Sequence, residues 1–358
     1  MIISGGGTGG HIYPAISIAQ EIQRRFPQVE ILFVGAKGKM EMQKVPKAGF
    51  EIKGLWISGL QRKLTVSNML FPIKLGLSIL RSFSILQKFK PDLVIGVGGF
   101  ASGPLLYAAS LKGLPTLIHE QNSYAGITNK WLSGKVKKIC VAYDKMDRFF
   151  PKEKLMLTGN PVRKDIHNAS EKRDKGIKHF NLDLSLKTIL VVGGSLGART
   201  INQSIKQNLD QLKSANVQVL WQTGGAYIDD LKALDGGCIH VYDFIYEMDL
   251  AFAVADLVIS RAGASTISEL SIVGKPAILV PSPNVAEDHQ TKNVLALTDK
   301  NAALLVKDID APEHLVDEAL KLLNDEIQQQ VYIDNICKLA MPNAVELIVD
   351  EALKLIKL

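Results

Sequence analysis

The residues best suited to chemistry are a glycine-rich loop near the start of the chain and the histidine that follows it. The segment from Gly5 to Gly10 holds five glycines in six residues, more than a tight turn requires, between a strand-like and a helical segment. The backbone N–H groups of such a loop, with the helix N-terminus, can bind a phosphate without side-chain charge. His11 lies at the mouth of the loop, where an imidazole could take or give a proton. A plain turn with a structural histidine is the alternative.

Two further glycine loops follow strand-like runs. Gly96 to Pro104 is a candidate for a second phosphate cradle, and its Ser102 and Pro104 suit a helix start. If the first two loops lie at the carboxyl ends of parallel strands in one sheet, they suit a pyrophosphate. The third loop, Gly193 to Ala198, puts Ser195 where it could meet a nucleotide phosphate. None of the loops fits G-x-G-x-x-G with an acidic residue about 20 positions on, so dinucleotide binding is disfavoured.

Two polar side chains further on could bind a sugar nucleotide. Glu269 follows the small residues from Ala262 to Ser268 on the first turns of an expected helix, and its carboxylate could accept both hydroxyls of a ribose. Favourable interaction with the helix dipole is the alternative role. Gln290 is a candidate reader of sugar hydroxyls, or simply a polar residue at a helix start.

The elements that must position these residues alternate between strands and helices. Short runs rich in Ile, Val and Leu read as buried parallel strands, with amphipathic stretches such as Ala15 to Arg25 and Thr266 to Val273 between them. The strand-like runs are Ile31 to Val34, Leu93 to Val97, Thr116 to Ile118, Ile189 to Val192, Val217 to Trp221, Leu257 to Ile259 and Ala277 to Val280. The pattern predicts an α/β protein with two doubly wound domains.

The domain boundary is expected near Asn160 to Arg163. A polar stretch without a strand pattern begins there, and each side of it has its own glycine loop. We therefore predict one domain over residues 1–160 and another over 161–342. The helical spacing of apolar residues in 343–358 predicts a terminal helix that packs back onto the first domain.

Charge is distributed unevenly between these halves. Residues 1–160 hold 22 Lys and Arg against 9 Asp and Glu, whereas residues 161–358 hold 20 against 27. The first half is therefore expected to face an anionic surface or ligand. Nucleic acid is disfavoured, because aromatic residues are only 6% and no recognition motif is present.

The chain runs from Met1 straight into the glycine loop without a secretory signal pattern, which predicts a protein that stays inside the cell.

A basic and apolar segment predicts contact with a membrane. No acidic residue occurs from Ile52 to Pro91, where seven Lys and Arg accompany apolar side chains. Charges break every run that could span a bilayer, so the segment is expected to lie on an anionic leaflet. A core helix with solvated lysines is the alternative. The membrane-facing candidates are Met69, Leu70, Ile73, Leu77 and Leu80.

Seven motifs, in order and spacing, resemble the MurG family of glycosyltransferases over nearly the whole chain. They are Gly5 to His11, Gly98 to Pro104, His119 to Asn122, Gly159 to Arg163, Gly193 to Ser195, Ala264 to Glu269 and Asp288 to Gln290. The resemblance implies a GT-B fold, with two Rossmann-like domains separated by a cleft, donor mainly on the second and lipid acceptor mainly on the first. It implies inverting transfer of N-acetylglucosamine from UDP to the 4-hydroxyl of a lipid-linked muramyl pentapeptide, lipid I, at the cytoplasmic face of the inner membrane.

The resemblance also implies roles for individual residues. Contacts with UDP-N-acetylglucosamine would come from Thr8, Gly9, Gly10, Asn122, Arg163, Ser195, Ile245 through its backbone at the uracil, Ala264, Ser265, Thr266, Ile267, Ser268, Glu269 at the ribose, and Gln290. The acceptor pyrophosphate would meet Gly7, Gly98, Gly99, Ser102 and Gly103. Leu196 stands where some relatives have a polar residue after the serine, so only a backbone contact is expected at this position.

Within this reaction His11 is our candidate for the general base. Loop amides and a helix dipole could stabilise the departing diphosphate, so no metal or cofactor is expected. Asp308 and Asp310 form the one Asp-x-Asp pair, and their place before Ala311 and Pro312 predicts helix capping.

A cell-wall synthesis complex is a candidate partner. The alternatives are a UDP-sugar transferase acting on another membrane lipid such as diacylglycerol, and a sugar-nucleotide-binding scaffold without activity.

Overall fold

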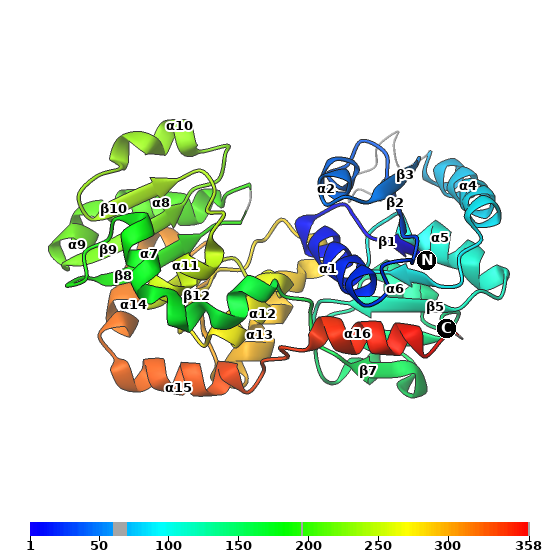
Figure 1. The fold of residues 1–358 in the computed structure, drawn as a ribbon. Coiled ribbons are helices and arrows are strands. Elements are labelled where there is room, and N and C mark those ends of the chain that lie inside the picture. Colours follow the sequence, from blue (N-terminus) through cyan, green and yellow to red (C-terminus); the bar gives the residue numbers. More distant parts are fainter. Residues whose placement is uncertain (60–69, 195, 357–358) are drawn as a thin grey trace. The chain divides into compact units, whose positions relative to one another are not determined.

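The computed structural model describes residues 1–59, 70–194 and 196–356, and divides the chain into two compact units. Unit 1 comprises residues 1–162 and 343–358, and unit 2 comprises residues 163–342. The division falls two residues from the expected boundary. Each unit has a parallel sheet of its own between helices (Figure 1). The α/β fold expected from the sequence is confirmed.

Within the described part of unit 1, seven parallel strands form a sheet in the order β3-β2-β1-β4-β5-β6-β7. Their bounds are β1 Ile2–Ser4, β2 Leu32–Ala36, β3 Glu51–Leu55, β4 Val94–Gly96, β5 Thr116–Glu120, β6 Lys138–Val141 and β7 Leu155–Leu157. The chain reverses direction along the sheet after β3, so that β1 and β4 are neighbours, with Ile2 beside Val94 and Ser4 beside Gly96. Ligands bind open α/β sheets at such a point, outside the carboxyl ends of the strands.

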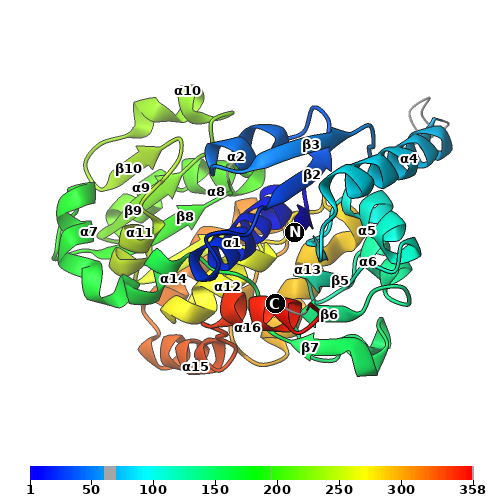
Figure 2. The same cartoon turned by 45° about the vertical axis from the view of Figure 1, so that its right-hand side comes forward.

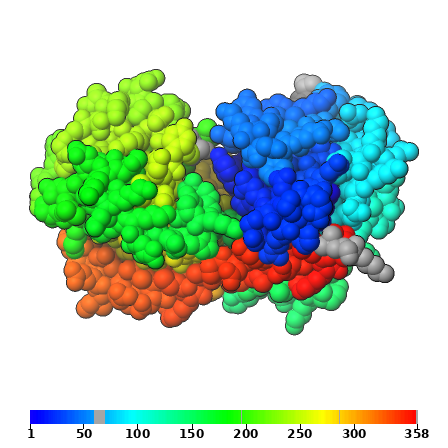
Figure 3. Space-filling view, viewed as in Figure 1, coloured from blue at the N-terminus to red at the C-terminus, as the bar shows by residue number. Residues whose placement is uncertain are grey.

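The helices of unit 1 cover both faces of this sheet because its strands β1, β2, β4 and β5 are buried on both faces. They are α1 Gly9–Arg25, α2 Glu41–Lys47, α4 Phe71–Phe89, α5 Ser102–Leu111, α6 Ile127–Leu132 and α16 Ala344–Leu353. Helices α4 and α5 lie side by side in both ribbon views (Figures 1 and 2). The C-terminal helix α16 packs on α1, and its Ile348, Val349 and Ala352 join the core around Ile12. Figure 3 shows this segment, in red, lying along the blue N-terminal surface.

Unit 2 repeats the arrangement with six described strands in the order β10-β9-β8-β11-β12-β13. Their bounds are β8 Lys187–Val192, β9 Val217–Gln222, β10 Ile239–Tyr242, β11 Leu257–Ser260, β12 Ala277–Leu279 and β13 Leu304–Leu305. The main helices are α7 Arg173–Phe180, α8 Arg199–Gln207, α9 Leu209–Ser214, α11 Met248–Val254, α12 Ala264–Val273, α13 His289–Thr298, α14 Ala311–Leu323 and α15 Glu326–Cys337. A 3-10 segment, η3 Lys164–Lys172, precedes α7.

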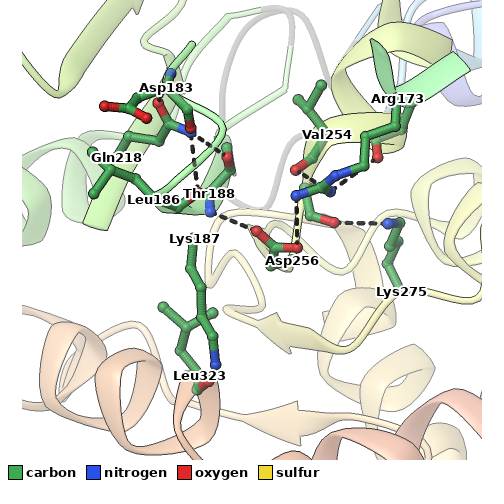
Figure 4. A network of polar contacts seen from close by, with 12 residues as sticks. Arg173, Asp183, Leu186, Lys187, Thr188, Gln218, Val254, Asp256, Lys275 and Leu323 are labelled. Atoms are coloured by element: carbon green, nitrogen blue, oxygen red, sulfur yellow. Dashed lines mark hydrogen bonds and ion pairs between the residues drawn. The ribbon is translucent and has the colours of Figure 1, made fainter. Parts of the chain in front are cut away.

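A network of hydrogen bonds and ion pairs lies at the amino ends of the strands of this sheet (Figure 4). The Asp256 carboxylate, just before β11, accepts the N–H of Thr188 in β8 at 2.7 Å and pairs with Arg173 of α7 at 3.3 Å. Lys275, just before β12, donates to the Ala255 carbonyl at 2.7 Å, and burial lowers its pKa. These bonds join three strands and a helix at the edge opposite the glycine loops, so the network serves stability.

Candidate active site

The first two glycine loops touch each other at the carboxyl ends of β1 and β4 in unit 1. A Cβ on Gly99 would lie 2.3 Å from the Gly6 carbonyl oxygen, and one on Gly98 would lie 2.6 Å from the His11 ring. Both glycines also have φ near +90°, which side chains rarely adopt. A residue with a side chain fits at neither position. The two glycines therefore allow the two loops to approach each other closely enough to form one site.

His11 lies in the first turn of α1, which begins at Gly9. Its ring is partly buried against Gly98, and its Nδ1 lies 3.2 Å from the hydroxyl oxygen of Thr8, the residue at the N-cap. This hydrogen bond orients the imidazole. The structure thus brings the candidate base together with both glycine loops, as a general base for an acceptor held there requires.

Two residues expected to meet the acceptor pyrophosphate are bonded within unit 1. The Gly7 N–H donates to Glu41 at 2.9 Å, and the buried Ser102 hydroxyl donates to the Gly99 carbonyl at 2.8 Å. Gly98 and Gly103 are buried as well, while Thr8 and Gly10 are exposed. The accessible part of the cradle therefore runs from Thr8 to Gly10 at the N-terminus of the 17-residue helix α1.

Asn122 lies on a loop fixed by buried polar groups of its own motif, for which the sequence indicated no separate role. The Glu120 carboxylate accepts the N–H groups of Asn122 and Gly126 at 3.1 and 3.0 Å and the Asn129 amide at 2.9 Å, and burial raises its pKa. Burial also lowers the pKa of His119 to about 4, so this imidazole is neutral and its Nε2 bonds the Gly159 carbonyl. The motif from His119 to Asn122 is thus mainly a rigid support for Asn122.

Unit 2 has a cavity of about 450 Å³ at the carboxyl ends of β8 and β11. It is lined by the third glycine loop, the start of α12, and the segment before α13. Among the lining residues are Gly193, Gly194, Arg199, Thr200, Arg261, Gly263, Thr266, Ser282, Gln290 and Asp308. Two predicted donor residues, Thr266 and Gln290, therefore share one cavity, whereas Ser195 lies outside the described residues.

Asp308 has a different role from the one expected. It pairs with Arg261 and accepts a hydrogen bond from the Thr200 hydroxyl at 2.9 Å, both of which line the cavity. Helix α14 has Asp310 at its N-cap with no side-chain cap bond. The prediction that Asp308 caps this helix is wrong, because the partly buried Arg261 guanidinium is its better partner, whereas Asp310 does occupy the N-cap position. In the described ranges, no cluster of three or more His, Cys, Asp or Glu could hold a metal.

Two side-chain amides hold parts of the same cavity: Gln290 lines it, and Gln222 bonds to Gly194, which lines it. The Gln290 carbonyl accepts the Ser282 N–H at 2.8 Å, which directs the Gln290 amide nitrogen to donate elsewhere. Gln222, which the sequence did not indicate, links the third loop to the predicted uracil site. Its Nε2 donates to the Gly194 carbonyl at 3.1 Å, and its Oε1 accepts the Ile245 N–H at 2.9 Å. Because the Ile245 N–H already donates to Gln222, the expected backbone contact of Ile245 with the uracil would have to be made by its carbonyl.

Glu269 lies in the second turn of α12, near Arg163, which precedes the 3-10 segment η3, and Asp165, which lies in it. Its pKa is raised to about 7, mainly by burial, with Arg163 opposing the rise and Asp165 adding to it. The structure thus places two predicted donor residues, Arg163 and Glu269, within electrostatic reach of each other. Residues 264–268 form the first turn and a half, where Ala264 and Ile267 are buried and Ser268 bonds the Ala264 carbonyl at 3.0 Å.

The membrane-facing candidates within the described residues lie on α4 or just before it. Leu70, Ile73, Leu77 and Leu80 have exposed fractions of 38, 56, 48 and 66%. Lys74, on the same helix, lies over the Trp56 ring at 5.6 Å. Met69 falls outside the described residues. None of the helices in the described ranges is long and apolar enough to cross a membrane.

Comparison with known proteins adds a family to this geometry. Residues 1–141 match the glycosyltransferase family 28 N-terminal domain, and residues 188–348 match the family's C-terminal domain. The chain is 58% identical to the UDP-N-acetylglucosamine--N-acetylmuramyl-(pentapeptide) pyrophosphoryl-undecaprenol N-acetylglucosamine transferase of Cytophaga hutchinsonii, over 99% of this chain and 96% of that protein. It is 57% identical to the transferase of the same name from Flavobacterium psychrophilum, over 99% and 97%.

Two solved structures have a similar fold over nearly the whole chain. The crystal structure of Acinetobacter baumannii MurG superposes with a TM-score of 0.77 at 30% identity, over 99% of each chain. The UDP-GlcNAc 2-epimerase from Neisseria meningitidis superposes with a TM-score of 0.66 at 16% identity, over 99% of each chain, a likeness that shows the fold alone.

Proposed function

The chain belongs to the MurG family of glycosyltransferases, and we propose on this basis that it converts lipid I to lipid II. It transfers N-acetylglucosamine from UDP-N-acetylglucosamine to the 4-hydroxyl of undecaprenyl-pyrophosphoryl-N-acetylmuramyl-pentapeptide, a step of peptidoglycan synthesis. The observation that carries the proposal is near full-length identity of 58% to a transferase named for this reaction.

The acceptor pyrophosphate is held by the paired glycine loops of unit 1. Gly9 is partly exposed and Gly10 is exposed at the positive end of α1, where a helix of 17 residues favours an anion, and the family motif assigns these two glycines, with Thr8, to contacts with UDP-N-acetylglucosamine. Gly99 lies against Gly6 and is partly exposed, so it is open to the acceptor. The buried Gly98, Ser102 and Gly103 give the second loop its shape, so they support the pyrophosphate site indirectly. The excess of Lys and Arg over Asp and Glu in residues 1–160 favours the same anionic ligand.

The donor is held by unit 2. The cavity beside the third glycine loop takes the diphosphate and sugar, with the Gln290 amide nitrogen donating to a sugar hydroxyl. Arg163 and Glu269 bind the ribose end, where an ionised carboxylate can accept two hydroxyls. Ser195 belongs to the same loop and is assigned a phosphate contact by its position in the family motif.

The reaction is a single displacement with inversion at the anomeric carbon. His11 accepts the proton of the acceptor 4-hydroxyl as that oxygen bonds to the anomeric carbon of N-acetylglucosamine. The bond from this carbon to the UDP oxygen breaks, and UDP leaves with the electron pair. Loop amides and helix dipoles stabilise the charge on the diphosphate, which makes a metal ion unnecessary. No covalent sugar-enzyme intermediate forms, because one displacement gives the β-linkage.

The enzyme acts as a peripheral protein on the cytoplasmic leaflet of the inner membrane. The exposed Leu70, Ile73, Leu77 and Leu80 insert among lipid headgroups, and the lysines and arginine of α4, which are Lys74, Arg81 and Lys88, meet anionic phospholipid. Each cation near such a surface contributes about 1 kcal/mol, so attachment weakens as salt rises. Its substrate is a membrane lipid, which also suits membership of a cell-wall synthesis complex.

The test is transfer of labelled N-acetylglucosamine to a muramyl-pyrophosphoryl-lipid acceptor in the presence of EDTA. A parallel reaction offers UDP-glucose and diacylglycerol. Transfer to the muramyl lipid despite chelation supports the proposal and its metal-free chemistry. Transfer to diacylglycerol alone would leave the fold but replace the function, and no transfer in either reaction would favour a sugar-nucleotide-binding scaffold.

A further inference from the structure

Glu41 is a fully buried carboxylate that lies against the first glycine loop. One oxygen accepts the Gly7 N–H at 2.9 Å, and the other accepts the Ala36 N–H, also at 2.9 Å. The side chain is 0% exposed, so no ligand reaches it. Glu41 begins α2 and joins the ends of two neighbouring strands, β1 and β2. A buried carboxylate that accepts two amides is held firmly in one orientation.

Two glycines leave the space that this side chain fills. A Cβ on Gly6 would lie 2.3 Å from the carboxyl carbon of Glu41, and one on Gly35 would lie 2.5 Å from its Cγ. Gly6 is therefore required by an internal carboxylate. Part of the glycine content of the first loop thus serves Glu41 and not a phosphate.

The bond to Gly7 determines which part of the loop can face a ligand. Gly7 has a φ of +88°, and its N–H points inward to the carboxylate. The next residues, Thr8 to Gly10, turn outward and open α1, where His11 follows. If the bond were lost, Gly7 could rotate, and Gly9, Gly10 and the His11 ring would shift with it.

We propose that Glu41 is a positioning residue for glycosyl transfer. It fixes Gly7, and through Gly7 it sets the positions of the amides of Gly9 and Gly10 and the imidazole of His11 relative to the two substrates. Glu41 touches no substrate itself. This role rests on the proposed function, because it needs the acceptor to bind at this loop.

The experiment compares purified Glu41→Gln and Glu41→Ala enzymes with the wild type, measuring kcat with the muramyl lipid and the melting temperature. Glu41→Gln keeps the shape but puts an amide NH₂ against a backbone N–H, and Glu41→Ala removes both bonds. We expect kcat to fall about 10- to 100-fold, since small displacements of catalytic groups have effects of this size. The loss should be greater in Glu41→Ala.

The matched control is Glu21→Gln, another buried carboxylate of unit 1. Glu21 is 3% exposed and pairs with Arg24 and Arg25 about 15 Å further along α1 from His11. This variant should lose stability but keep its kcat. If Glu41→Ala loses no more kcat than this control at equal loss of melting temperature, Glu41 is merely structural and the proposal is overturned.

A second variant tests the same contact with the carboxylate present. Gly6→Ala pushes Glu41 away from the loop and should lower kcat as Glu41→Ala does. The double variant Gly6→Ala/Glu41→Ala should be no worse than either single one, because all three break one contact. Additive losses would overturn the proposal. An inactive wild type would refute the proposed function and this role with it, whereas active wild-type and Glu41→Ala enzymes would refute this role alone.

Discussion

Binding of UDP-N-acetylglucosamine should depend on pH through Glu269. Burial raises the pKa of this carboxyl to about 7, so the group changes its charge across neutral pH. The ionised form can accept both ribose hydroxyls, whereas the protonated form has a hydrogen that competes with them. The donor should therefore bind more tightly as pH rises through 7.

The size of the effect follows from the fraction of ionised carboxylate. With a pKa of about 7, this fraction is about 10% at pH 6 and about 90% at pH 8. If only the carboxylate binds the ribose, affinity rises about ninefold over this interval, or about 1.3 kcal/mol. An unperturbed glutamate, already ionised at pH 6, would give almost no change.

Titration calorimetry with UDP-N-acetylglucosamine from pH 5.5 to 8.5 measures this directly. The sugar nucleotide is preferable to UDP, whose terminal phosphate titrates in the same range. Glu269→Gln should bind weakly with no such pH dependence, and His11→Ala, which removes the imidazole beside the glycine loops, should keep the dependence. An identical pH profile in Glu269→Gln, or a flat profile in the wild type, would refute the reasoning.

The same pKa predicts an effect on stability of the opposite sign. Because burial raises the pKa of the folded state, ionisation of Glu269 disfavours folding as pH rises from 4.5 to about 7, and the penalty is complete above 7. A shift of about 2.5 units corresponds to about 3.4 kcal/mol at most, and less here since the side chain is partly exposed. Glu269→Gln should therefore raise the free energy of unfolding at pH 8 but not at pH 4.

Three other variants test the remaining assignments. His11→Ala should lower kcat by about 100-fold or more with little change in the Kd of UDP-N-acetylglucosamine, as measured by initial rates and calorimetry, and an unchanged kcat would remove it from the mechanism. Leu77→Ser with Leu80→Ser should reduce sedimentation with anionic vesicles without changing the melting temperature, and full vesicle binding would exclude α4 as the membrane surface. Asp256→Ala should lower the free energy of unfolding by about 2 to 4 kcal/mol in urea while the folded enzyme keeps its kcat, since the network in Figure 4 lies away from the glycine loops.

The strands could be predicted because apolar runs are local properties of the sequence, and the meeting of the glycine loops then follows from the geometry of a parallel sheet. Continuous apolar runs such as Leu93 to Val97 can be buried on both faces only in a parallel sheet. The carboxyl ends of such strands lie at one edge, so two loops that follow neighbouring strands must meet. The close contact of Gly99 with Gly6 is the realised form of this rule.

The partners of individual polar groups could not be predicted, because they come from distant parts of the chain. Asp308 reads as a helix cap from its neighbours, yet its partners Arg261 and Thr200 lie 47 and 108 positions away. Gln222 ends a buried strand, and nothing in its local sequence shows that its amide links Gly194 to Ile245. For such residues the partner determines the role, and the partner is set by tertiary packing.

The first glycine loop illustrates why a correct motif can carry an incomplete explanation. Five glycines in six residues indicate a phosphate cradle, but the space at Gly6 is filled by Glu41, and the Gly7 amide is bonded to the same carboxylate. Only the part from Thr8 to Gly10 is left to face a ligand. A loop whose inner half is fixed by a buried charge does not need the ligand to order it, so binding costs less conformational entropy. The inner glycines are therefore part of the rigidity of the site, and the outer ones are part of its chemistry.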